Sequence, residues 1–577
     1  MSSRTVVARS KADEKRPVSR LPAVNSSKFE IRLLELLPDR QRAPVRCNFR
    51  VEALNDASIS YVALSYAWAE GDPSVRKTIF VDNQPVEVSW TLFGAIQRLR
   101  PSRSGQSLFL WVDALCINQD DPLEKTQQVD IMHRIYTQCA EVAVWLGGLG
   151  DVPPDHAQAA FDTVSWIAGE RASPPWENDD DPFCTPAVAA SALKTALTIR
   201  WWSRIWTVQE TILPPAGSFY WGPCAPLARA TLERASESFF DGTAPDGLPA
   251  PLWTSGALAD LQAGFRGLAF SRDEPPLRLL WRWRFRGASD ARDKVYGLLG
   301  VRRERDAAAL PSLRSCDYTV DAPTVYARLA ADLIRGGGDL LPLIGRRGEA
   351  RPTPGVPSWA VDWVPPPDPA DHCSEFWEHH RRWHGLSFCA DKGVRGVGDG
   401  LRVLDERVLH LDGVFVGKVA AVEPLGGAVR ADASFYELLL SRADVCAELV
   451  QNFQQRYPGV LSRDWMRTLW ALLMGKLVPE DPDHGDTIDD WVPTMTQHHS
   501  VFITEEGRFG LGPRTVEPGH EVWIVGGSRF PLLLQRREGP CQRDQIAEFI
   551  FEADCFVYGI MRGEAVHGKS QVPLLLH

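Results

Sequence analysis

The chain contains 577 residues, with 63 Lys or Arg against 74 Asp or Glu, so its formal net charge is −11. Because 44% of the residues are hydrophobic, the chain can build real cores, which excludes a wholly disordered protein. The negative charge argues against a general nucleic-acid-binding surface. No apolar run approaches the ~18 residues that a membrane span requires, so no span is predicted.

The eleven cysteines form no Cys-x-x-Cys pair and no regular pattern. An odd, unpatterned set is typical of reduced thiols rather than of a disulfide framework, which predicts a cytoplasmic protein. Residues 1–20 are polar and lack the apolar segment of a secretory signal. We therefore predict a disordered tail over residues 1–28.

The first predicted elements are β-strands. Residues 31–37 and 61–66 are apolar runs, and the second is suited to a buried strand. Residues 78–88 hold two short β-rich runs around Asp82-Asn83, which predicts a hairpin. Residues 91–99 have helical spacing.

The clearest unit is strand, helix, strand. Residues 108–112 and 142–146 are apolar strands, and between them Asp121 predicts a helix N-cap, with Pro122 in the first position and Glu124 where a capping box places it. Four apolar residues at spacings of 3, 4 and 3 then predict the buried stripe of one helix; they are Val129, Met132, Tyr136 and Cys139. A unit of this kind favours an α/β fold, in which a parallel sheet has helices on both faces.

Polar residues follow two of these strands. In such sheets the functional site usually lies at the carboxyl ends of the strands. Asp113, Asn118 and Gln119 could there hydrogen-bond a ribose or a phosphate, and Ser65 and Tyr66 could join them. Structural roles are the alternative: Asp120 or Asp121 as a helix cap, Asn118 in a turn, and Tyr66 in the core.

Residues 187–199 predict a further helix. The signals change after residue 300: residues 439–474 are mostly helical in pattern, and the last 80 residues alternate in short β-like runs. We predict an N-terminal α/β domain over residues 29–300 and a mixed α+β region over residues 301–577, whose role the sequence does not indicate.

Three motifs are assigned no chemistry. Residues 563–570 match the phosphate-binding Walker A pattern, but the seven residues that follow are too short and Pro-interrupted for the helix which that loop needs. The histidines between residues 372 and 384 fit a solvated polar helix better than a metal site, and no metal is predicted. The Gly-rich residues 507–513 predict a hairpin turn.

Several blocks together resemble the fungal heterokaryon-incompatibility (HET) domain family. In the family's order they are IRLL (31–34), YVALSYAW (61–68), LWVDALCINQ (110–119), EK with QQV (124–129), VWLG (144–147) and WSRIWTVQE (202–210). They cover roughly residues 29 to 215. Segments at 292–296, 357–359, 507–513 and 559–564 also look like these proteins, so the resemblance extends over most of the chain. One departure is Ala69, where the family usually has Gly.

The resemblance implies a role in fungal non-self recognition and regulated cell death. HET domains are distantly similar to TIR domains, which have a flavodoxin-like parallel sheet and some of which hydrolyse NAD+. Ser203, Trp206 and Glu210 have the spacing of the TIR Ser-x-x-Trp-Cys-x-x-Glu segment, with Thr207 in place of Cys. By this resemblance Glu210 is the catalytic carboxylate and NAD+ the substrate, with no cofactor; the substrate-binding candidates are Ser65, Tyr66, Trp68, Asp113, Asn118, Gln119, Ser203 and Trp206.

The residues themselves leave alternatives open. Glu210 could merely pair with Arg204 or Arg200, and Trp206 could be core. The protein could be a signalling module without catalysis that acts by self-association or with another incompatibility protein. It could also be an enzyme or accessory protein of fungal secondary metabolism.

Overall fold

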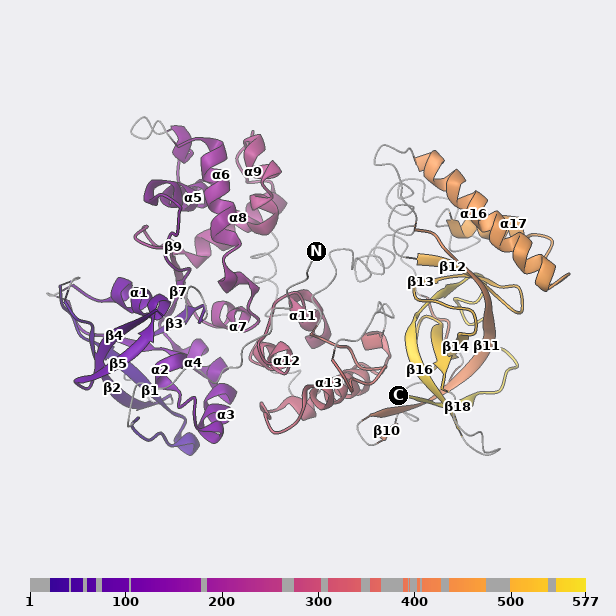
Figure 1. Ribbon diagram of the computed structural model, residues 1–577, viewed down its shortest axis with the longest axis horizontal. Helices are drawn as coiled ribbons and strands as arrows, with labels where there is room; N and C mark the ends of the chain where they lie inside the picture. The colour runs from indigo at the N-terminus through magenta and orange to yellow at the C-terminus, as the bar shows by residue number, and fades with distance from the viewer. Residues whose placement is uncertain are drawn as a thin grey trace. The chain divides into compact units, whose positions relative to one another are not determined.

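The computed structural model places the chain in two compact units (Figure 1). The units comprise Met1–Arg303 with Ser315–Tyr318, and Glu304–Arg314 with Thr319–His577. The structure describes residues 21–40, 43–54, 60–68, 75–102, 105–177, 184–261, 274–301, 310–343, 353–364, 388–392, 394, 402–404, 407–426, 435–473, 499–537 and 546–577. The histidine-rich segment 372–384 and Ala69 lie outside these residues.

The N-terminal unit is built on one sheet with the strand order β5-β4-β2-β1-β6-β3-β7-β8-β9. Its strands are β1 (Glu30–Leu36), β2 (Arg46–Ala53), β3 (Val62–Tyr66), β4 (Arg76–Val81), β5 (Gln84–Ser89), β6 (Leu108–Trp111), β7 (Glu141–Trp145), β8 (Gly217–Tyr220) and β9 (Leu227–Ala228). The central strands β6, β3, β7 and β8 are parallel, whereas β1–β2, β1–β6, β4–β5 and β8–β9 pair antiparallel. The predicted α/β fold with a parallel sheet and flanking helices is confirmed, with antiparallel strands added on its flanks.

The predicted hairpin at Asp82-Asn83 is confirmed. Strands β4 and β5 pair in register from Arg76↔Ser89 to Val81↔Gln84. Asp82 and Asn83 have φ values of 50° and 64°. Two consecutive left-handed residues match the twist of a two-residue hairpin, and Asp and Asn tolerate this conformation best among residues other than Gly.

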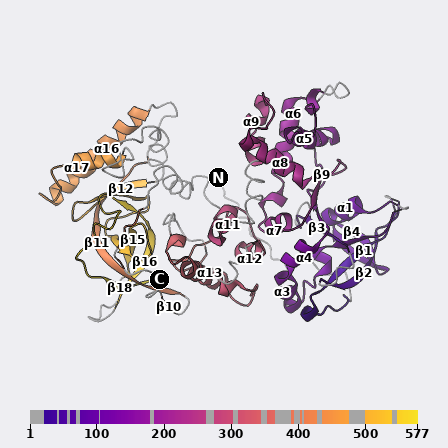
Figure 2. The ribbon, with the colours of Figure 1, turned by 180° about the vertical axis from the view of Figure 1, so that it is seen from behind.

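Helices flank this sheet. They are α1 (Trp90–Leu99), α2 (Asp113–Cys116), α3 (Pro122–Asp130), α4 (Met132–Gln138), α5 (Pro154–Ile167), α6 (Pro186–Leu197), α7 (Thr207–Ile212), α8 (Arg229–Asp241), α9 (Ala250–Thr254), α11 (Pro276–Trp283) and α12 (Asp293–Leu299), with 3-10 turns η2 (Ser26–Lys28), η3 (Pro175–Glu177) and η4 (Arg200–Ser203). Helix α5 packs against α6 and α8, and the three lie together in both views (Figures 1 and 2).

The prediction of one continuous helix after Asp121 is wrong. Its start is as predicted, with Asp121 as N-cap and Pro122 in the first turn, but the helix ends at Asp130 and α4 begins at Met132. Ile131 leaves helical geometry, with φ −94° and ψ 2°. The buried side chain of α3 is Gln128, which donates 3.0 Å to the Glu30 carbonyl on β1, so α3 turns this polar residue to the sheet where an apolar stripe was expected.

The C-terminal unit is rich in β-strands. They are β10 (Arg402–Leu404), β11 (Val408–Pro424), β12 (His499–Thr504), β13 (Phe509–Pro513), β14 (Glu521–Val525), β15 (Leu532–Arg536), β16 (Ala547–Asp554), β17 (Phe556–Val557) and β18 (Val572–Leu576). The pairings β11–β14, β14–β15, β15–β16, β16–β18 and β18–β11 close a ring, which is a small barrel. The long strand β11 continues past the barrel to pair with β12.

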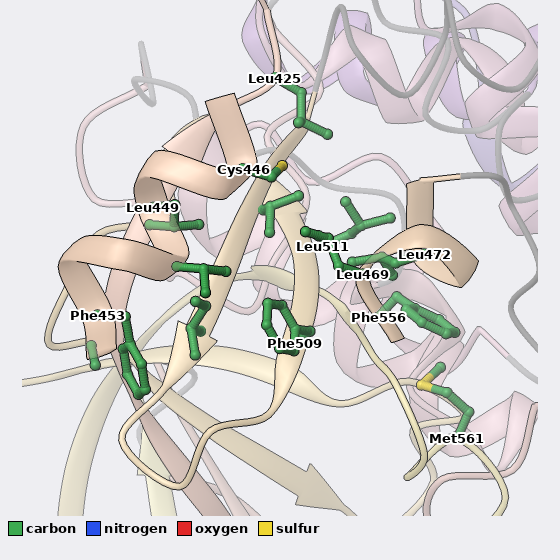
Figure 3. Close-up of a cluster of buried hydrophobic side chains, with 14 of the residues drawn as sticks. Leu425, Cys446, Leu449, Phe453, Leu469, Leu472, Phe509, Leu511, Phe556 and Met561 are labelled. Carbon is green, nitrogen blue, oxygen red and sulfur yellow. The ribbon is translucent and has the colours of Figure 1, made fainter. Parts of the chain in front are cut away.

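Helices cover part of this unit. They are α13 (Ala322–Gly337), α16 (Phe435–Arg456) and α17 (Trp465–Leu473), with 3-10 turns η6 (Pro311–Leu313) and η7 (Leu341–Leu343). Figure 3 shows Phe453 of α16 and Leu472 of α17 in one apolar cluster with Phe509 and Leu511 of β13. The predicted helical stretch over residues 439–474 and the β-rich C-terminal region are confirmed, and burial of these side chains stabilises the layer of helix on sheet.

The two Gly-rich motifs have the structures that the sequence predicts. Gly507, with φ 78°, lies in the turn of the β12–β13 hairpin. Residues 563–568 form turns, and the next regular element is strand β18. A Walker A loop requires a helix at this point, so the match is coincidental. No disulfide joins the cysteines that the structure describes.

Candidate functional site

The site begins where two parallel strands end. Ser65 and Tyr66 close β3, and Asp113 opens α2 two residues after β6 ends at Trp111. Because β3 and β6 are parallel neighbours, with Ala63 opposite Trp111, both ends lie at one edge of the sheet. The carboxyl ends of β3 and β6 therefore lie next to each other, as predicted.

Glu210 is joined to this edge by a buried hydrogen-bond chain. The hydroxyl of Ser65 is bonded to Glu210 Oε2, and Trp201 Nε1 donates 2.7 Å to Ser65 Oγ. An indole N–H can only donate, so Ser65 accepts from Trp201 and its own proton is available for the carboxylate. Glu210 is 3% exposed, Ser65 1% and Trp201 0%. Residues separated by more than 130 positions are thus brought into one chain of contacts.

Two arginines provide the positive charge around Glu210. Arg204 donates to the carbonyl oxygen of Tyr66, which holds it at the end of β3. Arg286, which is 1% exposed, donates 2.5 Å to Thr207 Oγ1 at the start of α7. Among the described residues Glu210 forms no ion pair, so the direct Glu210–Arg204 or Glu210–Arg200 pair given as an alternative is absent there. Both cations act on the carboxyl through space.

Burial dominates the electrostatics of both acids. It raises the pKa of Glu210, while Arg204, the Ser65 hydrogen bond and Arg286 act in the opposite direction. The pKa of Asp113 is raised to about 7, first by burial and then by the negative charge of Glu210. The charge of Glu210 therefore acts on Asp113, and the Asp113 carboxyl has its pKa close to neutral pH.

Asp113 is fixed by three neighbours. Its Oδ2 accepts 2.9 Å from Trp68 Nε1 and its Oδ1 accepts 2.7 Å from the Ala114 amide. Gln119 Nε2 donates 3.1 Å to the Asp113 carbonyl. Three predicted site residues, Trp68, Asp113 and Gln119, therefore form one hydrogen-bonded group, in which the Asp113 side chain is only partly buried.

Asn118 has a structural partner. Its side-chain oxygen accepts a hydrogen bond of 3.3 Å from the Asp120 backbone amide. Its backbone amide donates a hydrogen bond of 2.6 Å to Glu124 Oε1. Asp121 caps α3, as one of the predicted alternatives held, by accepting from Leu123 and Glu124 amides. Glu124 is engaged by Arg32 and does not return the capping-box bond to Asp121. These contacts order the loop that carries Gln119.

The other members of the proposed TIR-like segment lie differently. Ser203 is exposed, and its hydroxyl donates 2.8 Å to the Arg200 carbonyl. Trp206 is partly buried and its carbonyl accepts from the Glu210 amide at 3.2 Å. Tyr66 is 3% exposed and contributes its backbone carbonyl to Arg204. Ser65, and not Ser203, is the hydroxyl on the Glu210 carboxyl.

The sequence analysis did not predict two residues that lie near the Glu210 carboxyl. Tyr136 on α4 is buried, stands edge-on to Trp111 with ring centroids 5.5 Å apart, and has its pKa raised by burial, by Glu210 and by Asp113. Arg286 ends an alternation of aromatic residues and arginines over residues 281–286, WRWRFR. That alternation is the one signal that could have drawn attention to it.

The described parts of the chain contain no group of three or more His, Cys, Asp or Glu side chains placed to hold a metal ion. The polar groups at the site are suited instead to hydrogen-bonding: carboxyls at Glu210 and Asp113, an amide at Gln119 and a hydroxyl at Tyr136. None of the helices described combines the length and apolar composition of a membrane crossing.

Comparison with known proteins gives two findings. Residues 61–210 match the family model described as heterokaryon incompatibility protein (HET). Over an alignment of 647 positions, the chain is 25% identical to heterokaryon incompatibility protein 6, OR allele, of Neurospora crassa, which covers 88% of this chain and 90% of that protein. No solved structure matches the chain. The family match begins at β3 and ends at Glu210, so it spans every strand end that builds the site.

Proposed function

We propose that this chain, whose residues 61–210 match the heterokaryon incompatibility (HET) family model, acts in fungal non-self recognition and regulated cell death, and that its Glu210 site hydrolyses NAD+. The recognition role rests on the family match over residues 61–210 and on the similarity to an incompatibility protein along most of the chain. Its partners are a second copy of the chain or another incompatibility protein.

One observation carries the catalytic proposal: the Glu210 carboxyl is buried at the carboxyl edge of the sheet, bonded to Ser65 and electrostatically coupled to Asp113. Buried, mutually coupled acids with shifted pKa values are typical of catalytic sites. The spacing from Ser203 to Glu210 resembles that of TIR hydrolases and adds support. NAD+ is the substrate, and no cofactor is required.

The chemistry suits a carboxylate in this environment. When the bond between nicotinamide and ribose C1′ breaks, its electron pair leaves with the nicotinamide nitrogen and positive charge develops on the ribose. An ionised Glu210 would stabilise that charge more strongly in a dry site than in water. Water then adds to C1′ and releases a proton, which gives ADP-ribose. Asp113 and Gln119, held together at the strand end, are candidates for hydrogen bonds to the ribose hydroxyls.

The test is release of nicotinamide from NAD+ by the purified protein. We expect Glu210→Gln to lower the rate by at least about 100-fold, the usual cost of removing a group that stabilises transition-state charge. Glu237→Gln, an exposed glutamate of α8, is the matched control and should behave as wild type. If wild type remains silent after forced self-association, the catalytic proposal is wrong.

A module without catalysis is the second candidate, and the 3% exposure of Glu210 favours it. A carboxyl so enclosed could serve only to fix α7 against β3. In that case expression in fungal cells should arrest growth while cellular NAD+ stays constant, and Glu210→Gln should act through loss of folded protein.

A further inference from the structure

The segment that follows α11 is fastened to the segment that carries Glu210. The Gly287 amide donates 2.5 Å to the Ser203 carbonyl, and the Ile205 amide donates 2.9 Å to the Gly287 carbonyl. Gly287 and Arg204 form an isolated parallel bridge. Arg286 is therefore held by backbone bonds directly beside the start of α7.

Lys294 of α12 fixes the same segment from the other side. Its ammonium group, on a residue only 6% exposed, donates to the carbonyls of Arg284, at 2.6 Å, and Arg286. Two carbonyl oxygens of the segment thus accept hydrogen bonds from one buried ammonium group. The effect is to fix the backbone from which the Arg286 side chain extends.

The guanidinium of Arg286 is enclosed. It lies 4.6 Å from the centroid of the Trp283 ring and bonds Thr207 Oγ1 at 2.5 Å. Its Nε has no hydrogen-bond partner among the described residues. A buried guanidinium without an ion pair is costly to hold unless an opposite charge lies near, and the acid that acts on it is Glu210.

We propose that Arg286 is a positioning residue of the Glu210 site: anchored by Lys294, Gly287 and Thr207 at the start of α7, its buried guanidinium adds to that of Arg204 a fixed positive charge that favours the ionised Glu210 carboxyl. This inference rests on the proposed function only for its consequence in catalysis. The other groups that surround the carboxyl are Ser65 of β3, Asp113 of α2, Tyr136 of α4 and Arg204 before α7.

The test is a titration of Glu210 itself. The infrared difference between each protein and the same protein carrying Glu210→Gln isolates the carboxyl band, which reports ionisation directly. In Arg286→Gln we expect the midpoint of this titration to move up by about 1 pH unit, as when a nearby cation is removed from an acid. Arg286→Lys should move it less, and Arg282→Gln, which removes a cation of α11 paired with Glu274, should leave it in place.

Activity gives the second readout. If the proposed function holds, nicotinamide release by Arg286→Gln falls at neutral pH and recovers as the pH is raised, because the carboxyl then ionises without the charge of Arg286. A merely structural role would lower the rate equally at all pH values. If Arg286→Gln does not fold, Arg286→Lys and Lys294→Met take its place, with a smaller shift in the same direction.

Failure of the two proposals is distinguishable. An inactive wild type with a shifted Glu210 titration in Arg286→Gln rejects NAD+ hydrolysis and retains the role of Arg286. A folded Arg286→Gln protein whose carboxyl titrates as in wild type overturns that role, whether or not the enzyme is active.

Discussion

Two glutamates of the N-terminal unit, Glu124, which is half-buried, and Glu210, which is buried, are held in different ways. Glu124 receives the guanidinium fork of Arg32 at 2.6 and 2.9 Å, and also the Asn118 amide at 2.6 Å. Glu210 has one hydrogen-bond partner for its carboxyl among the described residues, the hydroxyl of Ser65, and its cations act from a distance. Both acids come from the stretch that matches the family model.

The difference in hydrogen-bond partners indicates a structural role for Glu124 and is compatible with a chemical role for Glu210. A carboxylate whose lone pairs are filled by an arginine fork and an amide is strongly fixed and has little capacity left for a ligand. One with a single neutral donor keeps acceptor capacity and a titration that responds to its surroundings. The Arg32–Glu124 pair joins β1 to α3, whereas Glu210 of α7 bonds Ser65 at the carboxyl end of β3, the edge at which we propose that the substrate binds.

The largest expected effect is on the Arg32–Glu124 pair. Arg32→Met leaves Glu124 charged and without its fork, and it removes a further bond to the Cys116 carbonyl at 2.9 Å. Breaking one side of a buried ion pair costs about 3–5 kcal/mol. We expect that loss in urea unfolding followed by tryptophan fluorescence. The Glu210→Gln variant should lose less than Arg32→Met, because an amide can still bond Ser65 and no direct ion pair is broken.

Similar losses in Arg32→Met and Glu210→Gln would contradict the comparison, since Glu210 would then be as structural as Glu124. Arg50→Met is a control for charge alone, because Arg50 is a largely exposed partner of Glu35. Exposed pairs contribute about 0–1 kcal/mol.

The second prediction concerns pH. The pKa of Asp113 is about 7 in the folded protein, above its ordinary value of 3.8, so the folded state holds a proton that the unfolded chain releases between these values. The stability that this proton provides is present below pH 4 and is lost as the pH rises through 7. Asp113→Asn, which stays neutral, should match wild type near pH 4 and exceed it by about 2 kcal/mol at pH 8, after allowance for the partial exposure of the side chain. Equal pH dependence of the two unfolding curves would show that Asp113 is solvated.

Much of this architecture is readable in the sequence because its signals are local. The Asp82-Asn83 turn, the Asp121 cap and the apolar strand β3 each depend on a few adjacent residues. Their order along the chain also places Ser65 and Asp113 at one sheet edge, since parallel strands end together. The break at Ile131 carries no Gly or Pro signal in the sequence, and the bond from Gln128 to β1, almost a hundred residues away, could not be predicted from local spacing.

The electrostatic half of the site could not be predicted in the same way. Arg286 reaches α7 only because Gly287 pairs with the Ser203–Ile205 segment and Lys294 holds the backbone behind it. No period or spacing encodes these contacts. The same holds for Ser65 as the partner of Glu210, where the spacing of the TIR-like segment directed attention to Ser203.

Ser65→Ala tests the assignment of Ser65, rather than Ser203, as the hydrogen-bond partner of Glu210. It removes the acceptor of Trp201 Nε1, which then lies buried without a partner, at a cost of about 1–2 kcal/mol. It also removes a bond that favours the ionised carboxyl, so the titration of Glu210 should move upward. Ser203→Ala, whose hydroxyl bonds only the local Arg200 carbonyl, should change stability by no more than about 0.5 kcal/mol. Greater destabilisation by Ser203→Ala than by Ser65→Ala would reverse the assignment.

The smallest expected loss of stability is at Asp121. The structural and functional interpretations of the 113–121 loop make different predictions for this residue. Its carboxylate accepts from the Leu123 amide at 3.0 Å and the Glu124 amide at 3.3 Å. Asp121→Ala should cost about 1 kcal/mol, and Asp121→Asn, an equally good cap, should cost almost nothing. Neither change should move the titration of Glu210, because the Asp121 carboxylate bonds backbone amides at the start of α3. A shift of that titration in Asp121→Ala with stability unchanged would mean that the loop belongs to the site as a whole, and the division between Glu124 as structure and Glu210 as chemistry would then be too sharp.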